Sequence, residues 1–202
     1  MSALVCEHCA ATLRPIAGPR CRNCGKELIS ETGLCMRCRS RSWSFDEAWP
    51  LFAYEGAAAR LVGAYKFSGR RSLAALFAAL CAKVLDERWP GWPIVPVPFR
   101  REKMVKRGWD QVEEIVRRLE AAGRPAQRIL ERLPSGEQKR LGQDERFVNA
   151  RRAYRLREGA RPPERAVLLD DVFTTGATAE ACALALKRGG TERVAFLSIA
   201  AD

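Results

Sequence analysis

The chain is organised around Ala166–Thr178, which reads AVLLDDVFTTGAT. The apolar run Ala166–Leu169 has the length of a buried strand, and we expect this strand to stop at the adjacent acids Asp170 and Asp171. A short loop rich in hydroxyl groups follows the acids, and apolar residues at helical spacing over Ala179–Lys187 predict a helix. The stretch is therefore predicted to form a strand, a loop and a helix.

The predicted loop suits a phosphate group. A loop that enters a helix directs free backbone N–H groups and the positive end of the helix dipole at one point. Gly176 allows the backbone to approach a ligand closely, and Thr178 or a neighbouring threonine can cap the helix. We therefore expect a phosphate to be bound by five consecutive residues, Thr174, Thr175, Gly176, Ala177 and Thr178.

The two acids need a different partner, because carboxylates repel phosphate. We expect Asp170 and Asp171 to accept hydrogen bonds from hydroxyl groups, or to hold a divalent cation directly or through water. A phosphorylated sugar offers both a phosphate and hydroxyl groups. The alternative is that the acids are ordinary strand-end residues and that the threonines belong to a solvated loop.

The stretch resembles the phosphoribosyl diphosphate (PRPP) binding signature of the class I phosphoribosyltransferases: a hydrophobic strand, two acids, two apolar residues and T-T-G-x-T. The resemblance implies an α/β fold with a Rossmann-like parallel sheet flanked by helices, magnesium bound together with PRPP, and catalytic roles for Asp170 and Asp171 at the ribose hydroxyl groups. Phe173 stands where the family usually has an aliphatic residue. Purine-salvage members carry an aspartate at the position of Thr174, so the resemblance is to the orotate and amidotransferase branches.

Length and composition describe a globular protein. The 202 residues suffice for one core and a small additional module, and 47% hydrophobic with 29% charged residues is typical of a folded, soluble chain. No apolar run approaches the roughly 18 residues of a membrane span, and the first residues lack the pattern of a secretion signal. We therefore expect no membrane insertion and a cytoplasmic location.

The positive charge is concentrated in the middle of the chain. The net charge is +11, and residues 100–165 contain 19 Lys and Arg against 11 Asp and Glu, whereas residues 166–202 contain 3 against 5. Such a surplus attracts the phosphates of a diphosphate ligand or of a nucleic-acid backbone. The alternative is a basic surface that has no binding role.

Six of the eight cysteines form three C-x-x-C pairs, separated by eleven and ten residues. Two such pairs make a tetrahedral four-thiolate site for a structural zinc ion. His8, inside the first pair, is an alternative ligand, and redox-active dithiols are the alternative chemistry. We expect a zinc module over residues 1–45, in which each zinc is held by four of six candidates: Cys6, Cys9, Cys21, Cys24, Cys35 and Cys38.

A second domain is expected over residues 46–202. In the linking segment Ser40–Pro50, the aromatic residues are expected to pack the module onto its neighbour rather than to stack on bases. Lys66 is interpreted as an exposed surface base, and a role in binding phosphate is the alternative. Further helices are predicted at about Ala57–Phe67, Arg71–Arg88 and Asp110–Ala121, and further strands at Pro93–Pro98, Ala126–Leu130, Ala153–Leu156 and Arg193–Ile199.

Two loops between these elements suit a phosphorylated ligand. Arg100, Arg101 and Arg107, with two lysines between them, precede a helix and are candidates for binding a diphosphate. The long polar stretch Arg132–Val148 is interpreted as a lid that excludes water from an activated sugar. The alternative is a flexible loop that does not cover a ligand.

Several motifs together resemble the ComF family. They are P-V-P at 96–98, R-G-W-D-Q at 107–111, and Gln138, Leu141, Arg146 and Asn149 ahead of an apolar strand. The chain departs from the family's R-G-F-N-Q at Trp109 and Asp110, and lacks the threonine usual before Gln138. The resemblance implies a zinc module joined to a phosphoribosyltransferase-like domain, and a role in natural transformation, in which incoming single-stranded DNA is handled beside a helicase-like translocase.

Two functions follow as hypotheses. The first is a phosphoribosyltransferase that uses magnesium and PRPP, with an acceptor that the sequence does not identify. The second is a non-catalytic adaptor that keeps the phosphoribosyl pocket and binds single-stranded DNA.

Overall fold

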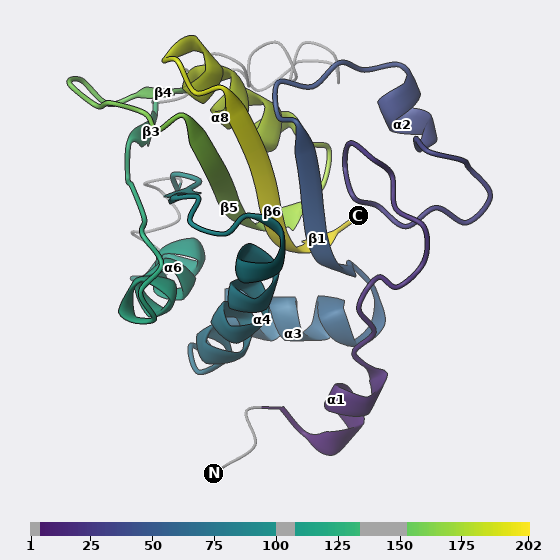
Figure 1. Ribbon diagram of the computed structural model, residues 1–202. Helices are drawn as coiled ribbons and strands as arrows, with labels where there is room; N and C mark the ends of the chain where they lie inside the picture. The colour runs from purple at the N-terminus through teal and green to yellow at the C-terminus, as the bar shows by residue number, and fades with distance from the viewer. Residues whose placement is uncertain (1–4, 100–107, 134–152) are drawn as a thin grey trace, which may run out of the picture.

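The computed structural model describes residues 5–99, 108–133 and 153–202, and a parallel sheet lies at its centre (Figure 1). The strand order is β1-β6-β5-β2, and all neighbouring strands are parallel. The central strands are near-continuous apolar runs because helices or loops cover both faces of the sheet. The four strands are β1 (Glu47–Ala53), β2 (Ile94–Pro96), β5 (Arg165–Phe173) and β6 (Arg193–Ala201).

Different layers cover the two faces of this sheet (Figure 1). One face packs against α3, α4 and α6, and the other against α8 and a two-stranded antiparallel hairpin, β3-β4. Each layer buries its own hydrophobic core. The elements are α3 (Gly56–Phe67), α4 (Leu73–Arg88), α6 (Gln111–Ala121), α8 (Ala177–Arg188), β3 (Leu130–Arg132) and β4 (Tyr154–Leu156).

The N-terminal segment runs along the outer edge of the sheet. It contains the short helices α1 (Glu7–Thr12) and α2 (Met36–Arg39), and backbone hydrogen bonds join its loops to β1. Ala48 N donates to Asn23 O at 2.8 Å, and Ile16 N donates to Leu51 O at 3.2 Å. The segment therefore covers the edge strand that would otherwise expose unpaired backbone groups.

The predicted α/β fold is confirmed, and α3, α4 and α6 lie within two residues of their predicted bounds. None of the described helices combines the length and the apolar character that a bilayer span requires. One strand boundary was wrong. β5 does not stop at Asp170 but continues to Phe173, because β6 pairs with it as far as Ala201.

Two other predictions at the edges of the sheet were wrong. The segment interpreted as a linker contributes β1, whose partner β6 lies far away in the sequence. The strand predicted over Ala126–Leu130 is reduced to a single bridge between Ala126 and Ile94, and β3 begins only at Leu130. In both cases the pairing partner, rather than the local composition, decides where the strand lies.

Candidate functional site

A cleft of about 300 Å³ opens at the carboxyl ends of β2 and β5. After β2 the chain enters α6 on one face of the sheet, whereas after β5 it enters α8 on the opposite face. The helices that follow these two neighbouring strands therefore lie on opposite faces of the sheet. This topological switch point is where open α/β sheets bind their ligands.

The β5 side of the cleft carries the predicted site. Asp170, Asp171, Thr174 and Thr178 all line it. The Thr175 hydroxyl accepts a hydrogen bond from Ala177 N at 3.3 Å and so holds the turn closed. The loop of residues 174–178, called the phosphate loop below, thus contributes Thr174 and Thr178 to the same cavity as both acids, whereas the three residues between them are not among the lining residues.

The two carboxylates have different surroundings. Asp171 Oδ2 lies 2.9 Å from Lys66 Nζ, and the two side chains are only 16% and 19% exposed. Lys66 is therefore a partly buried member of the cleft, and its interpretation as an exposed surface base was wrong. Asp170 Oδ1 instead accepts a hydrogen bond from Asp171 N at 2.8 Å.

Asp170 is half-buried, and part of its side chain faces the cleft. Loss of hydration raises the pKa of Asp170 to about 8, and the nearby charge of Asp171 acts in the same direction. At neutral pH this carboxyl group is therefore mostly protonated and can donate a hydrogen bond, while Asp171 is paired with Lys66.

Gly176 is the N-cap of α8 and adopts a left-handed conformation with φ 78°. Gly176 has no side chain to cap the helix, but the neighbouring Thr175 accepts a hydrogen bond from the first N–H of α8, so the predicted threonine cap comes from Thr175 and not from Thr178. A Cβ at Gly176 would lie 2.6 Å from the Trp43 ring and 2.8 Å from Phe173 Cζ. The structure thus shows a second need for glycine here, close packing against the segment before β1.

The β3-β4 hairpin supplies residues that the sequence analysis did not single out. Arg132 Nη1 donates to Tyr154 Oη at 2.7 Å, and both side chains line the cleft. Burial raises the pKa of Tyr154 to about 12, so its hydroxyl group stays protonated. These two residues flank residues 134–152, and only the hairpin pairing reveals that they are neighbours.

Asp110, one of the departures from the ComF pattern, caps α6. Its Oδ1 accepts a hydrogen bond from Glu113 N at 2.6 Å. Burial nevertheless raises the pKa of Asp110. Asp and Asn are equally good N-caps, which explains why either residue fits this position.

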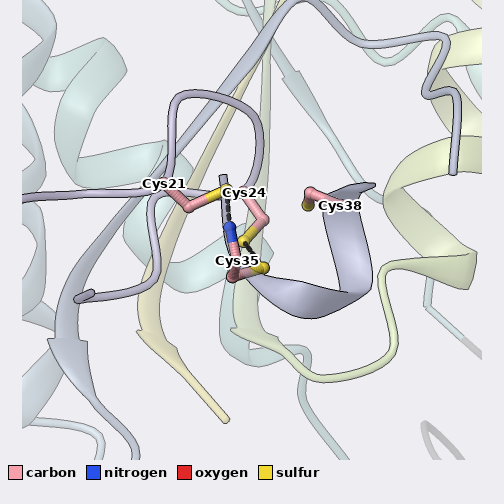
Figure 2. Close-up of side chains that lie close together, drawn as sticks. All are labelled: Cys21, Cys24, Cys35 and Cys38. Atoms are coloured by element: carbon pink, nitrogen blue, oxygen red, sulfur yellow. Dashed lines mark hydrogen bonds between the residues drawn. The ribbon is translucent and has the colours of Figure 1, made fainter. Parts of the chain in front are cut away.

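The second candidate site is formed by four buried cysteines, Cys21, Cys24, Cys35 and Cys38 (Figure 2). Their sulfur atoms all lie within 4.8 Å of one another. Cys24 Sγ is 3.6 Å from Cys35 Sγ, and Cys35 N donates to Cys21 Sγ at 3.4 Å. Two C-x-x-C pairs therefore converge as a four-thiolate zinc site requires.

The electrostatics of the cluster also fit a cation. Burial opposes ionisation of Cys21, but backbone N–H groups, including that of Cys35, outweigh it and lower the pKa of Cys21 to about 7. A hydrogen bond with Cys38, together with burial, raises the pKa of Cys24. One thiolate is thus available near neutral pH, and a bound zinc ion would stabilise the others as thiolates.

Of the first C-x-x-C pair, Cys6 lies outside this cluster. Cys6 is exposed just before α1 and His8 is exposed on α1, and neither belongs to the group of converging ligands; the side chain of Cys9 is outside the described part of the chain. Arg100, Arg101 and Arg107, and most of the predicted lid, also lie outside the described residues. Their predicted roles remain predictions.

Fold and sites together define an α/β protein with a ligand cleft at the sheet edge and a structural zinc-ribbon module. The model of the double zinc ribbon domain family matches residues 1–39. Competence protein ComFC of Streptococcus pneumoniae is 27% identical over 199 residues, which cover 96% of this chain and 86% of the relative.

Two further relatives carry similar names. Competence protein ComFC of Bacillus subtilis is 25% identical over 92% of this chain and 79% of its own length. Competence protein F of Haemophilus influenzae is 26% identical over 97% of this chain and 90% of its own length. The resemblance to the ComF family is thereby confirmed across nearly the whole chain.

Proposed function

We propose that the cleft binds PRPP, or a related phosphorylated ribose or nucleotide, together with magnesium. The 5-phosphate lies on the phosphate loop, and the ribose hydroxyl groups contact Asp170 and Asp171. One observation carries this assignment: both acids line the same cleft as Thr174 and Thr178, at the topological switch point of a parallel sheet.

The charges around the cleft suit this ligand. Thr174 and Thr178 offer hydroxyl groups beside the N-terminus of α8, whose dipole favours a phosphate. Protonated Asp170 can donate to a ribose oxygen, and Asp171, held by Lys66, can accept from one. Magnesium supplies charge neutralisation at the diphosphate when it is bound, and the arginines of residues 100–107 are expected to contact the same group.

As an enzyme, the protein would transfer the phosphoribosyl group. The bond between the anomeric carbon and the diphosphate oxygen breaks, the electron pair leaves with diphosphate, and an acceptor nucleophile attacks the anomeric carbon. Fixed positive charges around the leaving group would provide most of the acceleration. The rigid strand end of β5 would hold the ribose in place for this attack.

The relatives indicate the process in which this site would act. All three are named as competence proteins, so we place the protein in DNA uptake during natural transformation. In this proposal it works in the cytoplasm beside a helicase-like translocase, with a zinc module over residues 1–45 and a phosphoribosyltransferase-like domain over residues 46–202.

Calorimetry with PRPP and magnesium tests the proposal. The zinc-loaded protein should bind, and the double variant Asp170→Asn, Asp171→Asn should lose binding because both ribose partners change. Asp86→Asn is a matched control, since Asp86 is an exposed acid on α4 that pairs with Arg124 away from the cleft. Failure of the wild-type protein to bind would exclude the sugar pocket. Diphosphate release with candidate acceptors then distinguishes an enzyme from a binding protein.

The second candidate function is a non-catalytic adaptor for single-stranded DNA. The net charge of +11 favours it, because neutralising backbone phosphates is the main source of non-specific affinity. The affinity for an oligonucleotide should then fall steeply with salt concentration, with a slope that reports the number of phosphates contacted. Absence of binding at low salt would exclude this function.

A further inference from the structure

Residues of the zinc-binding segment, Cys21–Cys38, reach the phosphate loop directly. Arg37 lies on α2, between the zinc ligands Cys35 and Cys38. Its guanidinium group donates one hydrogen bond to the backbone oxygen of Thr174 and another, at 3.4 Å, to that of Asp202. The zinc site and the first residue of the phosphate loop are thus joined through one side chain.

A second contact holds the middle of the loop. The Trp43 ring occupies the space beside Gly176 where any other residue would place its Cβ. Trp43 also packs against Phe45 and Phe173, with ring centroids 5.0 and 6.3 Å apart. This cluster accounts for the aromatic residue at position 173, where class I phosphoribosyltransferases usually have an aliphatic one.

A third contact fixes the helix that follows the loop. Glu180, in the first turn of α8, is completely buried. Its carboxylate accepts hydrogen bonds from Ser44 N at 2.6 Å and from Ser44 Oγ at 2.9 Å. A buried carboxylate is stable only with such partners, so this bond anchors the segment before β1 to the start of α8.

We propose that the zinc-binding segment, together with Trp43 and Ser44 just after it, positions the phosphate loop, with Arg37 and Trp43 as positioning residues, so that zinc retention and phosphate binding are thermodynamically coupled. The identity of the ligand rests on the proposed function, whereas the contacts themselves are present without a ligand. Zinc fixes α2, α2 places Arg37, and Arg37 holds the Thr174 carbonyl group. By linkage, a ligand that orders the loop must in turn stabilise the zinc-bound state.

Hydrogen exchange of the zinc-loaded full chain tests the structural half of this proposal. In Arg37→Ala, the backbone amides of residues 174–178 should exchange about tenfold faster, because a hydrogen bond to a charged group is lost. Zinc content should not change, since Arg37 is not a ligand. Arg39→Ala is the matched control: Arg39 lies on the same short helix but donates to Leu34 O, within the segment. Equal exchange in both variants would overturn the proposal.

Zinc release to a chelator tests the coupling. Saturating ribose 5-phosphate should slow release severalfold in the wild-type protein and in Arg39→Ala, and have little effect in Arg37→Ala. Binding of ribose 5-phosphate without any slowing would overturn the coupling. If ribose 5-phosphate does not bind to the wild-type protein but PRPP with magnesium does, PRPP with magnesium replaces it in the release experiment. If neither binds, the proposed function fails, and the hydrogen-exchange experiment alone decides whether Arg37 positions the loop.

Discussion

The two faces of the central sheet are covered in different ways. The face under α3, α4 and α6 is covered by helices from one continuous part of the chain, residues 56–121. The opposite face is covered by α8 and the β3-β4 hairpin, and its hydrophobic core extends to the four cysteines beside the edge strand β1, so that it draws on three distant parts of the chain. One face thus follows from local helical periodicity, whereas the other depends on long-range contacts and a metal. The second face is also the one that carries the phosphate loop.

Removal of one zinc ligand should have the largest effect, confined to the second face. We expect Cys24→Ser to lose the metal and several kcal/mol of stability, because structural zinc binding contributes directly to folding. The measurement is zinc content per chain together with thermal unfolding. Cys6→Ser is the control, since Cys6 is exposed and outside the cluster. Retention of zinc by Cys24→Ser would contradict the assigned site.

Truncation of a core residue on the helical face should lower the free energy of unfolding nearly as much, but it should leave the metal in place. Phe77 is 1% exposed, and its ring contacts that of Tyr65 with centroids 5.3 Å apart. Phe77→Ala should cost about 3–5 kcal/mol. Urea unfolding measures the loss, and Leu76→Ala, at a partly buried position on the same helix, should cost less than half as much. Loss of zinc in Phe77→Ala would show that the two faces are not independent.

A smaller effect is expected where the zinc-side layer meets the phosphate loop. Gly176→Ala should cost about 2–3 kcal/mol, since the added Cβ meets both a positive φ and the Trp43 ring at 2.6 Å. Gly190→Ala separates the two causes. Gly190 has φ 105°, but nothing lies within 4 Å of its Cβ position, so only backbone strain should appear. If Gly176→Ala and Gly190→Ala lose similar stability in chemical denaturation, the Trp43 ring moves aside at little cost.

The last effect is smaller per step, because it accumulates with pH, and it concerns the sheet edge where both faces end. The pKa of Asp170 is about 8 in the folded protein and about 3.9 in an unfolded chain. Between these values the folded state binds more protons, so the free energy of unfolding falls as pH rises, by at most about 1.4 kcal/mol per pH unit.

An asparagine cannot ionise and therefore escapes this loss. In the absence of ligand, the stability of Asp170→Asn relative to wild type should increase from pH 5 to pH 8 and then level off. Denaturation at several pH values measures the difference, and Asp86→Asn, which changes an exposed acid, should show little such trend. A constant difference across this range would refute the half-buried, protonated carboxyl group.

The sequence predicted most of the helical face because its elements are local. The apolar stripe of α4 and the capped start of α6 are visible in single windows of sequence, and the structure places both helices nearly as predicted. The acids and threonines after β5 were recognisable for the same reason. Their spacing along one strand and loop already determines that they are neighbours.

Long-range pairing was not predictable in this way. The start of β1 was interpreted as part of a linker, yet this segment pairs with β6, and an edge strand tolerates Pro50. Tyr154 and Arg132 meet only through the hairpin, and Lys66 reaches Asp171 only because α3 packs beside β5. The spacing of the cysteines indicated zinc, but the fold was needed to show that the second and third pairs converge.

The pairing of β1 with β6 also has a consequence for how the protein folds during its synthesis. Asp46, just before β1, accepts a hydrogen bond from Val194 N at the start of β6, 148 positions further along. During translation β1 must therefore wait, unpaired, until β6 leaves the ribosome, and contacts of such high separation are slow to form. The nascent cysteines emerge well before this strand is in place, so the metal has time to load first and to keep the waiting edge from aggregating.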